Sequence, residues 1–600
     1  MGFDNAMWHF DEGVIGLFGQ WNVYSTVLVT FLIGIVTYHL STRTEPDTHP
    51  MLLARQAQGS PVRQEGESPV YRSRSAPHGM PLNPGLDVRD PGVSKWAKGR
   101  DGDLRDIWRR AVGGVPETEA PTGHAAASAA ASAVPKPTVG ARGKILTSYG
   151  TDSVVETSLE DITRQINLIG QHILDQGGAR VAIYLPNSVE FLASLFACSF
   201  YNMTAILLPF DQKDDAVLVS MLRRSAADTV ITAPGCFPFD TVVQSYPALR
   251  QLIWVVDEGS AHLDWNEVPK GMGGSVNVST WQDVVNDAPQ AAGRELPPLE
   301  GQSQPRDVTI FWEAYRDENN ESAATSVSSA PEEMVRFTSG NIVSAVAAQL
   351  FAVPSAQRIG PSDLFLPADS LTHTHTLVLT LAALYSNASV VLNSVAPRAA
   401  DLSMATRGIA PTVIVASPSA ALATHNEAIR LLGNGALASF FLNWQTRALT
   451  EGGVIPAATS FVSRFFDSAR PAVGKTPGKL RLLYVAERAA AGTPALSATV
   501  LSNLRIFTGA RVIYALAGAK VAGAAAQTAF YDYRVAPGKY APFGSPLSST
   551  EYLVRSKGSH EITDDKNEGE IVIRGPSVVG SEAALGVIGV IRDDNTLAYV

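Results

Sequence analysis

The 600-residue chain contains only two cysteines, Cys198 and Cys236. Neither has a Cys or His neighbour at the spacing of metal ligands, so the sequence predicts neither a disulfide framework nor a bound metal. Such a chain suits a reducing environment. Positive charge is also scarce, and the net charge of −10 provides no general attraction to nucleic acid. A nucleic-acid partner is therefore not expected.

Charge of either sign is missing from residues 23–40, which contain no Asp, Glu, Lys or Arg. A helix of this length is about long enough to cross a bilayer, so we interpret it as a transmembrane anchor. The preceding residues 1–22 are acidic, whereas Arg43 follows the stretch. The positive-inside rule then places residues 1–22 in the lumen and the body in the cytosol. The expected location is an intracellular membrane such as the endoplasmic reticulum. The alternatives are a buried helix and a segment that enters only one leaflet.

Apolar periodicity is lacking in residues 41–144, which are rich in Pro, Ser, Arg, Gly and Ala. This composition predicts a disordered linker. Regular alternation of helices and strands begins at about residue 145, with a helical pattern over 159–176 and a strand over 181–185. Buried parallel strands with crossover helices are the simplest interpretation. A polar, Pro-rich and acidic stretch, at about 287–330, is predicted to be an exposed insertion.

The junction at Thr338-Ser339-Gly340 follows an apolar strand and leads directly into a helix. Two hydroxyls at a helix N-terminus can hold an anion. The alternative is that Ser339 or Asn341 simply caps the helix.

The order of such landmarks resembles the adenylate-forming (AMP-binding) superfamily, in particular long-chain acyl-CoA synthetases. The landmarks are a strand–Pro–Asn–helix unit, the Thr-Ser-Gly junction, and three later motifs at Tyr514, at 543–547 and at 569–575. The resemblance implies an α/β fold for 145–600, with stacked α/β subdomains and a β-rich subdomain. It also implies that the small C-terminal domain of that family is absent from this chain.

Several nucleotide-binding features of the family have no counterpart in this sequence. The glycine-rich loop that would wrap the triphosphate is missing after Gly340, and 486–489 lack the glycines of the next turn. Neutral residues follow Tyr514 where a metal-binding Glu is expected, and Val587 replaces an Asp that binds ribose. The resemblance leaves these candidates for cofactor contact: Thr338, Ser339, Gly340, Tyr514 and Arg592. No catalytic residue is assigned, and ATP with Mg²⁺ and CoA are expected only if the chain is active.

The segment 371–377 matches the family element that borders the acyl pocket, so the resemblance implies substrate contacts from Thr372, His373 and His375. If the segment is extended, His373 and His375 point the same way. Polar turn residues are the alternative interpretation. The family residues that are missing or replaced here are those that bind the nucleotide, not those that border the acyl pocket. A long-chain acyl ligand is therefore the expected partner.

Three hypotheses follow. The first is an acyl-CoA synthetase-like pseudoenzyme of lipid metabolism that keeps its acyl site, while ATP-dependent activation is lost or weak. The second is an active long-chain fatty acid-CoA ligase with a rearranged ATP site. The third is a membrane scaffold that uses the fold to bind protein partners of unknown identity.

Overall fold

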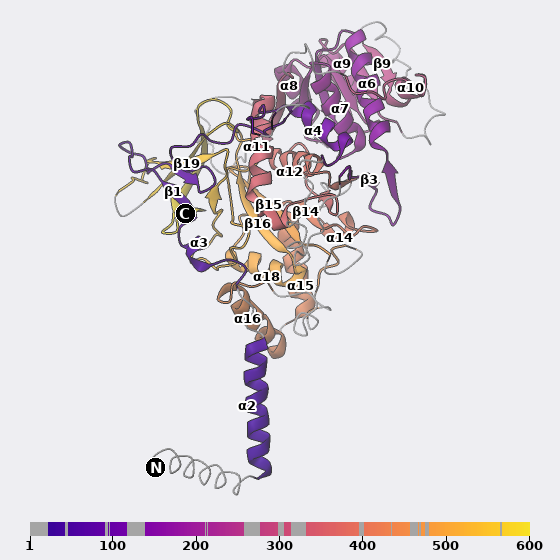
Figure 1. Ribbon diagram of the computed structural model, residues 1–600. Helices are drawn as coiled ribbons and strands as arrows, with labels where there is room; N and C mark the ends of the chain where they lie inside the picture. Colours follow the sequence, from indigo (N-terminus) through magenta and orange to yellow (C-terminus); the bar gives the residue numbers. More distant parts are fainter. Residues whose placement is uncertain are drawn as a thin grey trace.

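A computed structural model describes the chain in three β-sheets with helices packed on their faces, as Figure 1 shows. The described residues are 22–41, 46–89, 94, 96–116, 139–210, 212, 214–256, 276–297, 305–313, 332–394, 401–433, 435–455, 466, 470–474, 479–563 and 567–600.

The seven-stranded sheet forms the first α/β layer, with the strand order β11-β10-β6-β5-β7-β8-β9. All neighbouring strands are parallel except β10 and β11. The strands are β5 (Arg180–Tyr184), β6 (Thr204–Leu207), β7 (Thr229–Thr232), β8 (Gln251–Trp254), β9 (Asn277–Thr280), β10 (Val308–Glu313) and β11 (Glu332–Phe337). One face packs on α6 (Leu159–Asp175) and α7 (Val189–Phe200). The other face packs on α8 (Asp215–Ser225) and α9 (Phe239–Ser245), while α10 (Trp281–Asn286) packs on α6.

The nine-stranded sheet has the order β18-β17-β16-β15-β14-β12-β13-β3-β4. Its strands are β3 (Ile145–Ser148), β4 (Val154–Thr157), β12 (Leu364–Pro367), β13 (Ser389–Asn393), β14 (Val413–Ala416), β15 (Leu482–Arg488), β16 (Arg511–Ala517), β17 (Ala526–Gln527) and β18 (Ser545–Pro546). Helices α11 (Ser339–Ala352) and α12 (Thr374–Tyr385) belong to the apolar layer that joins this sheet to the first one. On the opposite face lie α14 (Leu402–Ala405), α15 (Pro418–Leu432) and α18 (Ala498–Thr508), and α16 (Ala436–Thr450) packs on α18.

The third sheet combines the two ends of the chain. Its antiparallel order is β1-β2-β19-β20-β21-β22, so short N-terminal strands extend a C-terminal sheet. The strands are β1 (Ala57–Gly59), β2 (Tyr71–Ser73), β19 (Glu551–Arg555), β20 (Glu568–Arg574), β21 (Ala583–Ile591) and β22 (Leu597–Tyr599). The α/β layers and this β-rich subdomain give the fold class expected for 145–600.

The prediction of a disordered linker over 41–144 is wrong for its described residues. Besides β1 and β2, this part forms α3 (Pro50–Ala54) and α4 (Leu104–Gly113), and α4 packs between α7 and α12. Trp108 of α4 is fully buried, and its Nε1–H donates to Thr163 Oγ1 at 3.1 Å. Composition missed this order because the stability comes from contacts with distant residues. The Ala-rich stretch at 117–138 lies outside the described residues.

The predicted insertion at 287–330 is also partly wrong, because β10 lies within it. Val308 to Trp312 are buried, and β10 pairs with both β6 and β11. The strand was not predicted, because the polar residues on both sides of it dominate the composition of 287–330. Residues 314–331 lie outside the described residues.

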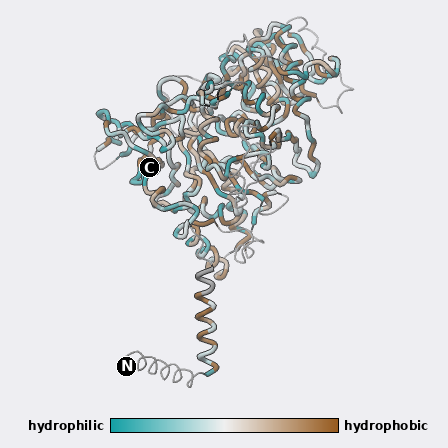
Figure 2. The backbone as a smooth tube through the Cα atoms, viewed as in Figure 1, coloured by the Kyte–Doolittle hydropathy of each residue, from teal (hydrophilic) through white to brown (hydrophobic). Residues whose placement is uncertain are grey.

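The charge-free stretch forms helix α2 (Val23–Ser41), which extends away from the rest of the chain and is largely hydrophobic in Figure 2. Its described side chains include highly exposed apolar ones, such as Tyr24 and Phe31. Within the described residues, however, no helix combines the length and apolar character needed to span a bilayer. The prediction of a transmembrane anchor at 23–40 is therefore not supported, and residues 1–21 lie outside the described part.

Candidate functional site

The junction between β11 and α11 is closed by its own side chains. Thr338 is the N-cap of α11, and its Oγ1 accepts from the Asn341 backbone N–H at 3.1 Å. In return, the Asn341 Oδ1 accepts from the Thr338 N–H at 3.0 Å, which completes a capping box. The helix is therefore capped at this junction, but the prediction that Ser339 or Asn341 is the cap is wrong: the cap is Thr338, and Asn341 is its partner at the third helical position.

The neighbouring polar groups at this junction also have protein partners. The buried Ser339 Oγ accepts from the Leu104 N–H of α4 at 3.1 Å. The Asn341 Nδ2 donates to the carbonyls of Pro576 and Val578, at 2.7 and 3.1 Å. Gly340 is exposed beside them. The junction thus ties α11 to α4 and to the β-rich subdomain.

Tyr514 is not open to a ligand. It is fully buried in β16, and its hydroxyl accepts from the Leu496 N–H at 3.0 Å. Its ring stacks on Phe543, with 5.0 Å between centroids, and burial raises the pKa of its phenol. The adenine ring of a nucleotide cannot stack on a side chain enclosed in this way without displacing core residues.

Arg592 lies apart from that junction, in the turn between β21 and β22. Its backbone N–H donates to the Thr596 carbonyl at 2.9 Å. Among the described residues, no hydrogen bond or ion pair joins its side chain to 338–340. The structure does not bring the five predicted cofactor contacts together.

The residues present do not fit ATP with Mg²⁺. Leu516 and Ala517 follow Tyr514 in the strand and offer no ligand for a metal, and Val587 offers no acceptor for ribose. Within the described part of the chain, no three His, Cys, Asp or Glu side chains are grouped as a metal site.

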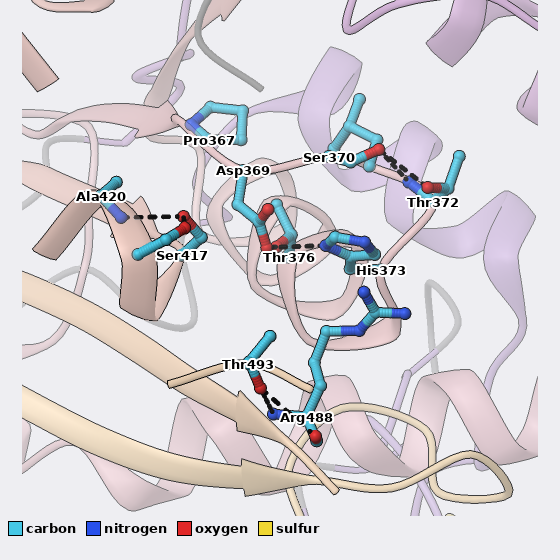
Figure 3. A network of polar contacts seen from close by, with 12 residues as sticks. Pro367, Asp369, Ser370, Thr372, His373, Thr376, Ser417, Ala420, Arg488 and Thr493 are labelled. Atoms are coloured by element: carbon cyan, nitrogen blue, oxygen red, sulfur yellow. Dashed lines mark hydrogen bonds and ion pairs between the residues drawn. The ribbon is translucent and has the colours of Figure 1, made fainter. Parts of the chain in front are cut away.

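A second polar region surrounds the start of α12 (Figure 3). Asp369 Oδ2 lies 2.9 Å from His373 Nδ1 and accepts from Thr376 Oγ1 at 3.0 Å. Burial alone would raise the Asp369 pKa, but His373 and Arg488 outweigh it and hold the pKa at about 2. The hydroxyls of Ser370 and Thr372 lie 2.8 Å apart.

Asn187 holds this loop in place. Its Nδ2 donates to the carbonyls of Pro367 and Asp369, at 3.2 and 2.8 Å. Its Oδ1 accepts from the Leu371 N–H at 3.0 Å. Through these hydrogen bonds, the Pro–Asn turn after β5 attaches the first sheet to the loop that precedes α12.

Arg488 ends β15 and points toward Asp369 and His373 in Figure 3. Its guanidinium lies 4.8 Å from the Trp312 ring centroid and 3.9 Å from a Glu313 carboxylate oxygen. Its Nε is buried without a hydrogen-bond partner in the described protein, and burial lowers the Arg488 pKa.

The adjacent Glu487 is buried, and only one of its two carboxylate oxygens has a hydrogen-bond partner among the described residues. One carboxylate oxygen accepts from Thr493 Oγ1 at 3.0 Å, whereas Oε2 has no partner among the described residues. Burial raises the Glu487 pKa to about 7, against the hydrogen bond from Thr493 and the charge of Arg488. This carboxyl can hold or release a proton near neutral pH.

His375 does not share the environment of His373. The segment is helical from Thr374, so the prediction that both histidines point the same way from an extended strand is wrong. His375 is 3% exposed, and neither ring nitrogen has a partner in the described protein. Burial lowers its pKa to about 4, and its ring lies 6.5 Å from that of Tyr484 on β15.

This cluster lies at the carboxyl ends of β12 and β15, where open α/β sheets bind their ligands. Of the residues predicted from the sequence, His373 contacts Asp369 in this cluster and Thr372 contacts the neighbouring Ser370, whereas His375 is buried near Tyr484 instead. Sequence reasoning missed Asp369, Glu487 and Arg488. The available signals were an Asp four residues before His373 and two adjacent charges that end an apolar strand. The atoms without a partner, on His375, Glu487 and Arg488, are of the kinds that donate hydrogen bonds to a polar ligand or accept them from it.

No family model matches the chain, and no curated protein matches its sequence. Solved structures do match its fold. The anthranilate CoA ligase AuaEII, in complex with anthranoyl-AMP, is 14% identical with a TM-score of 0.55, covering 83% of this chain and 77% of the other. The luciferase-like enzyme from the nonluminescent mealworm Zophobas morio is 10% identical with a TM-score of 0.53, covering 86% and 98%. A putative long-chain-fatty-acid CoA ligase from Rhodopseudomonas palustris is 16% identical with a TM-score of 0.51, covering 83% and 98%.

The chain therefore has the fold of the large N-terminal domain of adenylate-forming enzymes. Its structural neighbours include aryl- and acyl-CoA ligases, which confirms the expected fold class.

Proposed function

We propose that this protein is an acyl-CoA synthetase-like acid-binding protein of lipid metabolism in which ATP-dependent activation is lost or weak. The observation that carries the proposal is the closed junction at α11. There, Thr338 and Asn341 bind each other, while Ser339 binds α4 and Asn341 also binds the β-rich subdomain. A triphosphate would have to displace these contacts, and each hydrogen bond contributes about 1 kcal/mol.

The proposed ligand is a long-chain fatty acid whose head group meets the cluster at α12 and β15. Arg488 supports this assignment, because a buried guanidinium with a free Nε is suited to a carboxylate. Buried apolar residues of α11 and α12, such as Val346 and Val378, provide an apolar environment near the cluster. The ligase neighbours support an acyl or aryl acid as the ligand class.

Isothermal titration calorimetry of the chain with palmitate and with Mg–ATP tests this proposal. We expect saturable palmitate binding and no saturable Mg–ATP binding below about 1 mM, where the binding free energy is about −4 kcal/mol. Arg488→Met should weaken palmitate binding at least tenfold. The matched variant Arg592→Met should leave it unchanged.

The outcomes separate the hypotheses. A micromolar dissociation constant for Mg–ATP, with formation of an acyl-adenylate or acyl-CoA, would favour the active ligase. Absence of palmitate binding by the wild-type chain would favour the scaffold that binds protein partners.

We also propose that the protein associates with a lipid surface. Three apolar side chains, Leu437, Phe440 and Trp444, are 69%, 62% and 39% exposed on one face of α16. The chain just after α2 meets the chain just after α16, since the Asp47 N–H donates to the Gly453 carbonyl at 3.0 Å. Two exposed apolar helices thus lie close together, and such surfaces favour lipid.

Flotation with phosphatidylcholine–phosphatidylserine vesicles tests the lipid association. Replacing both Phe440 and Trp444 by Ser should reduce the bound fraction severalfold, whereas Phe351→Ser, at an exposed site on α11, should not. Equal flotation of all three proteins would contradict the proposal for α16.

A further inference from the structure

Strand β10 of the first sheet supplies two side chains that contact Arg488 of the second sheet. The Trp312 ring lies against the guanidinium, with 4.8 Å to the ring centroid, and a Glu313 carboxylate oxygen lies 3.9 Å from Arg488 Nη1. These two residues end β10, and Arg488 ends β15. The surroundings of the guanidinium therefore depend on residues of both sheets.

Trp312 is a fixed support for the guanidinium. Its side chain is buried, and its backbone is paired in register with Glu333 of β11. Among aromatic side chains, Trp attracts a cation most strongly, and the attraction is larger where water is excluded. Because the ring covers one face of the planar guanidinium, the N–H groups at its edge are the ones that a ligand can reach.

Glu313 differs from the other carboxylates near Arg488. Burial lowers the pKa of Arg488, and nearby carboxylates oppose this effect. Glu313 raises this pKa more than Asp369 and Glu487 do. The latter two accept hydrogen bonds from neighbouring side chains. In the described part of the chain, the side chain of Glu313 has no hydrogen bond or ion pair besides its contact with Arg488.

The two partners of this ion pair also differ in exposure. The side chain of Arg488 is 12% exposed, whereas that of Glu313 is 48% exposed. If the pair separates, water can hydrate the Glu313 carboxylate, but the buried guanidinium loses a charge partner, which is costly. A ligand carboxylate that replaces Glu313 removes this cost, because it forms charge-assisted hydrogen bonds with the guanidinium.

A second ion pair between strand β11 and the chain after β16 provides a matched comparison. A Glu333 carboxylate oxygen lies 3.1 Å from Lys520 Nζ. The side chain of Glu333 is 46% exposed, close to the value for Glu313, and its cationic partner is Lys520 rather than Arg488. The two glutamates thus differ mainly in which cation they neutralise.

We propose that Glu313 is an internal competitor of the acid ligand and that Trp312 is a positioning residue for Arg488. Without ligand, Glu313 neutralises the guanidinium. When the acid binds, its carboxylate takes the place of Glu313, while the Trp312 ring keeps the guanidinium in position. This inference rests on the proposed function, since it concerns the ligand partner of Arg488 in the same site.

Calorimetry of the whole chain with palmitate tests the role of Glu313. Glu313→Gln should tighten palmitate binding about threefold, which is the size expected for a half-exposed ion pair. The matched variant Glu333→Gln should stay within 1.5-fold of the wild type, as an ordinary surface change does. In the Arg488→Met background, Glu313→Gln should have no effect, because the competitor then has no target.

A second set of variants tests the role of Trp312. Trp312→Leu should weaken palmitate binding at least fivefold, whereas Trp312→Phe, which keeps an aromatic face, should stay within about threefold. The double variant Trp312→Leu/Arg488→Met should bind palmitate as Arg488→Met does, because the ring acts through the guanidinium. The melting temperature of each variant verifies that it is folded.

The outcomes separate this inference from the proposed function. If neither the wild type nor Glu313→Gln binds palmitate, the proposed function is wrong as well. If the wild type binds palmitate but Glu313→Gln gains no affinity, or gains only as much as Glu333→Gln, the competitor is disproved and the proposed function stands. If Trp312→Leu weakens binding equally with and without Arg488, the ring contributes only to the general structure of the site.

Discussion

Two polar regions of this protein differ in how their hydrogen bonds are used. At the start of α11, each polar side chain from Thr338 to Asn341 has a partner within the protein. Around α12 and β15, by contrast, His375, Glu487 and Arg488 retain buried atoms without a partner in the described chain. The comparison shows that the polar groups of the first region are used within the protein, whereas the second region has buried polar atoms without a protein partner, which is why we propose ligand binding there.

The largest expected effect concerns the first region. Asn341→Ala should lower the free energy of unfolding by about 4 kcal/mol, because it removes one half of the capping box and leaves the carbonyls of Pro576 and Val578 without their donor. Urea denaturation measures this change. The exposed Asn277, whose side chain donates to Gln176 at 3.0 Å, is the control. Asn277→Ala should lower the free energy of unfolding by less than about 0.5 kcal/mol. Equal losses for the two variants would mean that the hydrogen bonds of Asn341 do not stabilise the junction.

The next effect concerns Glu487, whose pKa rises from 4.5 to about 7 on folding because it is buried. The folded state binds this proton more tightly, so the stabilisation is present below pH 4.5 and is lost as the pH rises through 7. The loss is roughly 3 kcal/mol at pH 8 and above. Glu487→Gln should abolish this slope in denaturation curves recorded from pH 5 to 8. The exposed Glu561→Gln should keep the wild-type slope.

A smaller effect of opposite pH dependence is expected from His375. Its pKa falls from 6.5 to about 4 through burial, so stability is present above pH 6.5 and is lost as the pH falls toward 4. His375→Leu should raise the free energy of unfolding by about 1–2 kcal/mol at pH 7, because two unpaired nitrogens leave the interior. A destabilised Leu variant would mean that the nitrogens bind ordered water.

The smallest effect is expected at Arg592. Arg592→Ala should change the free energy of unfolding by less than about 0.5 kcal/mol, as for an ordinary surface substitution. It should also leave palmitate binding unchanged. A loss of binding would show that the turn between β21 and β22 contributes to the site after all.

The sequence predicted those parts of the fold whose signals are local. Helix α6 and strand β5 were expected within a residue or two of their observed bounds, since apolar periodicity defines both. Strands β1 and β2 were missed, because each has only three residues and depends on a neighbouring strand, β1 on β2 and β2 on the distant β19. Alternating residues at 371–377 suggested an extended strand, but Thr374 begins a helix. Within the site, Asp369 and Arg488 escaped notice because only the fold brings them together.

The joining of β2 to β19 has a consequence for how the protein is made. Arg72 pairs with Glu551 at 2.6 Å, across 479 residues of sequence. A ribosome adds about 5–20 residues per second, so β19 is synthesised roughly 24–96 s after β2. During that interval, the N-terminal strands expose unpaired backbone groups to other nascent chains. Chaperone demand should therefore fall mainly on the first hundred residues of the nascent chain.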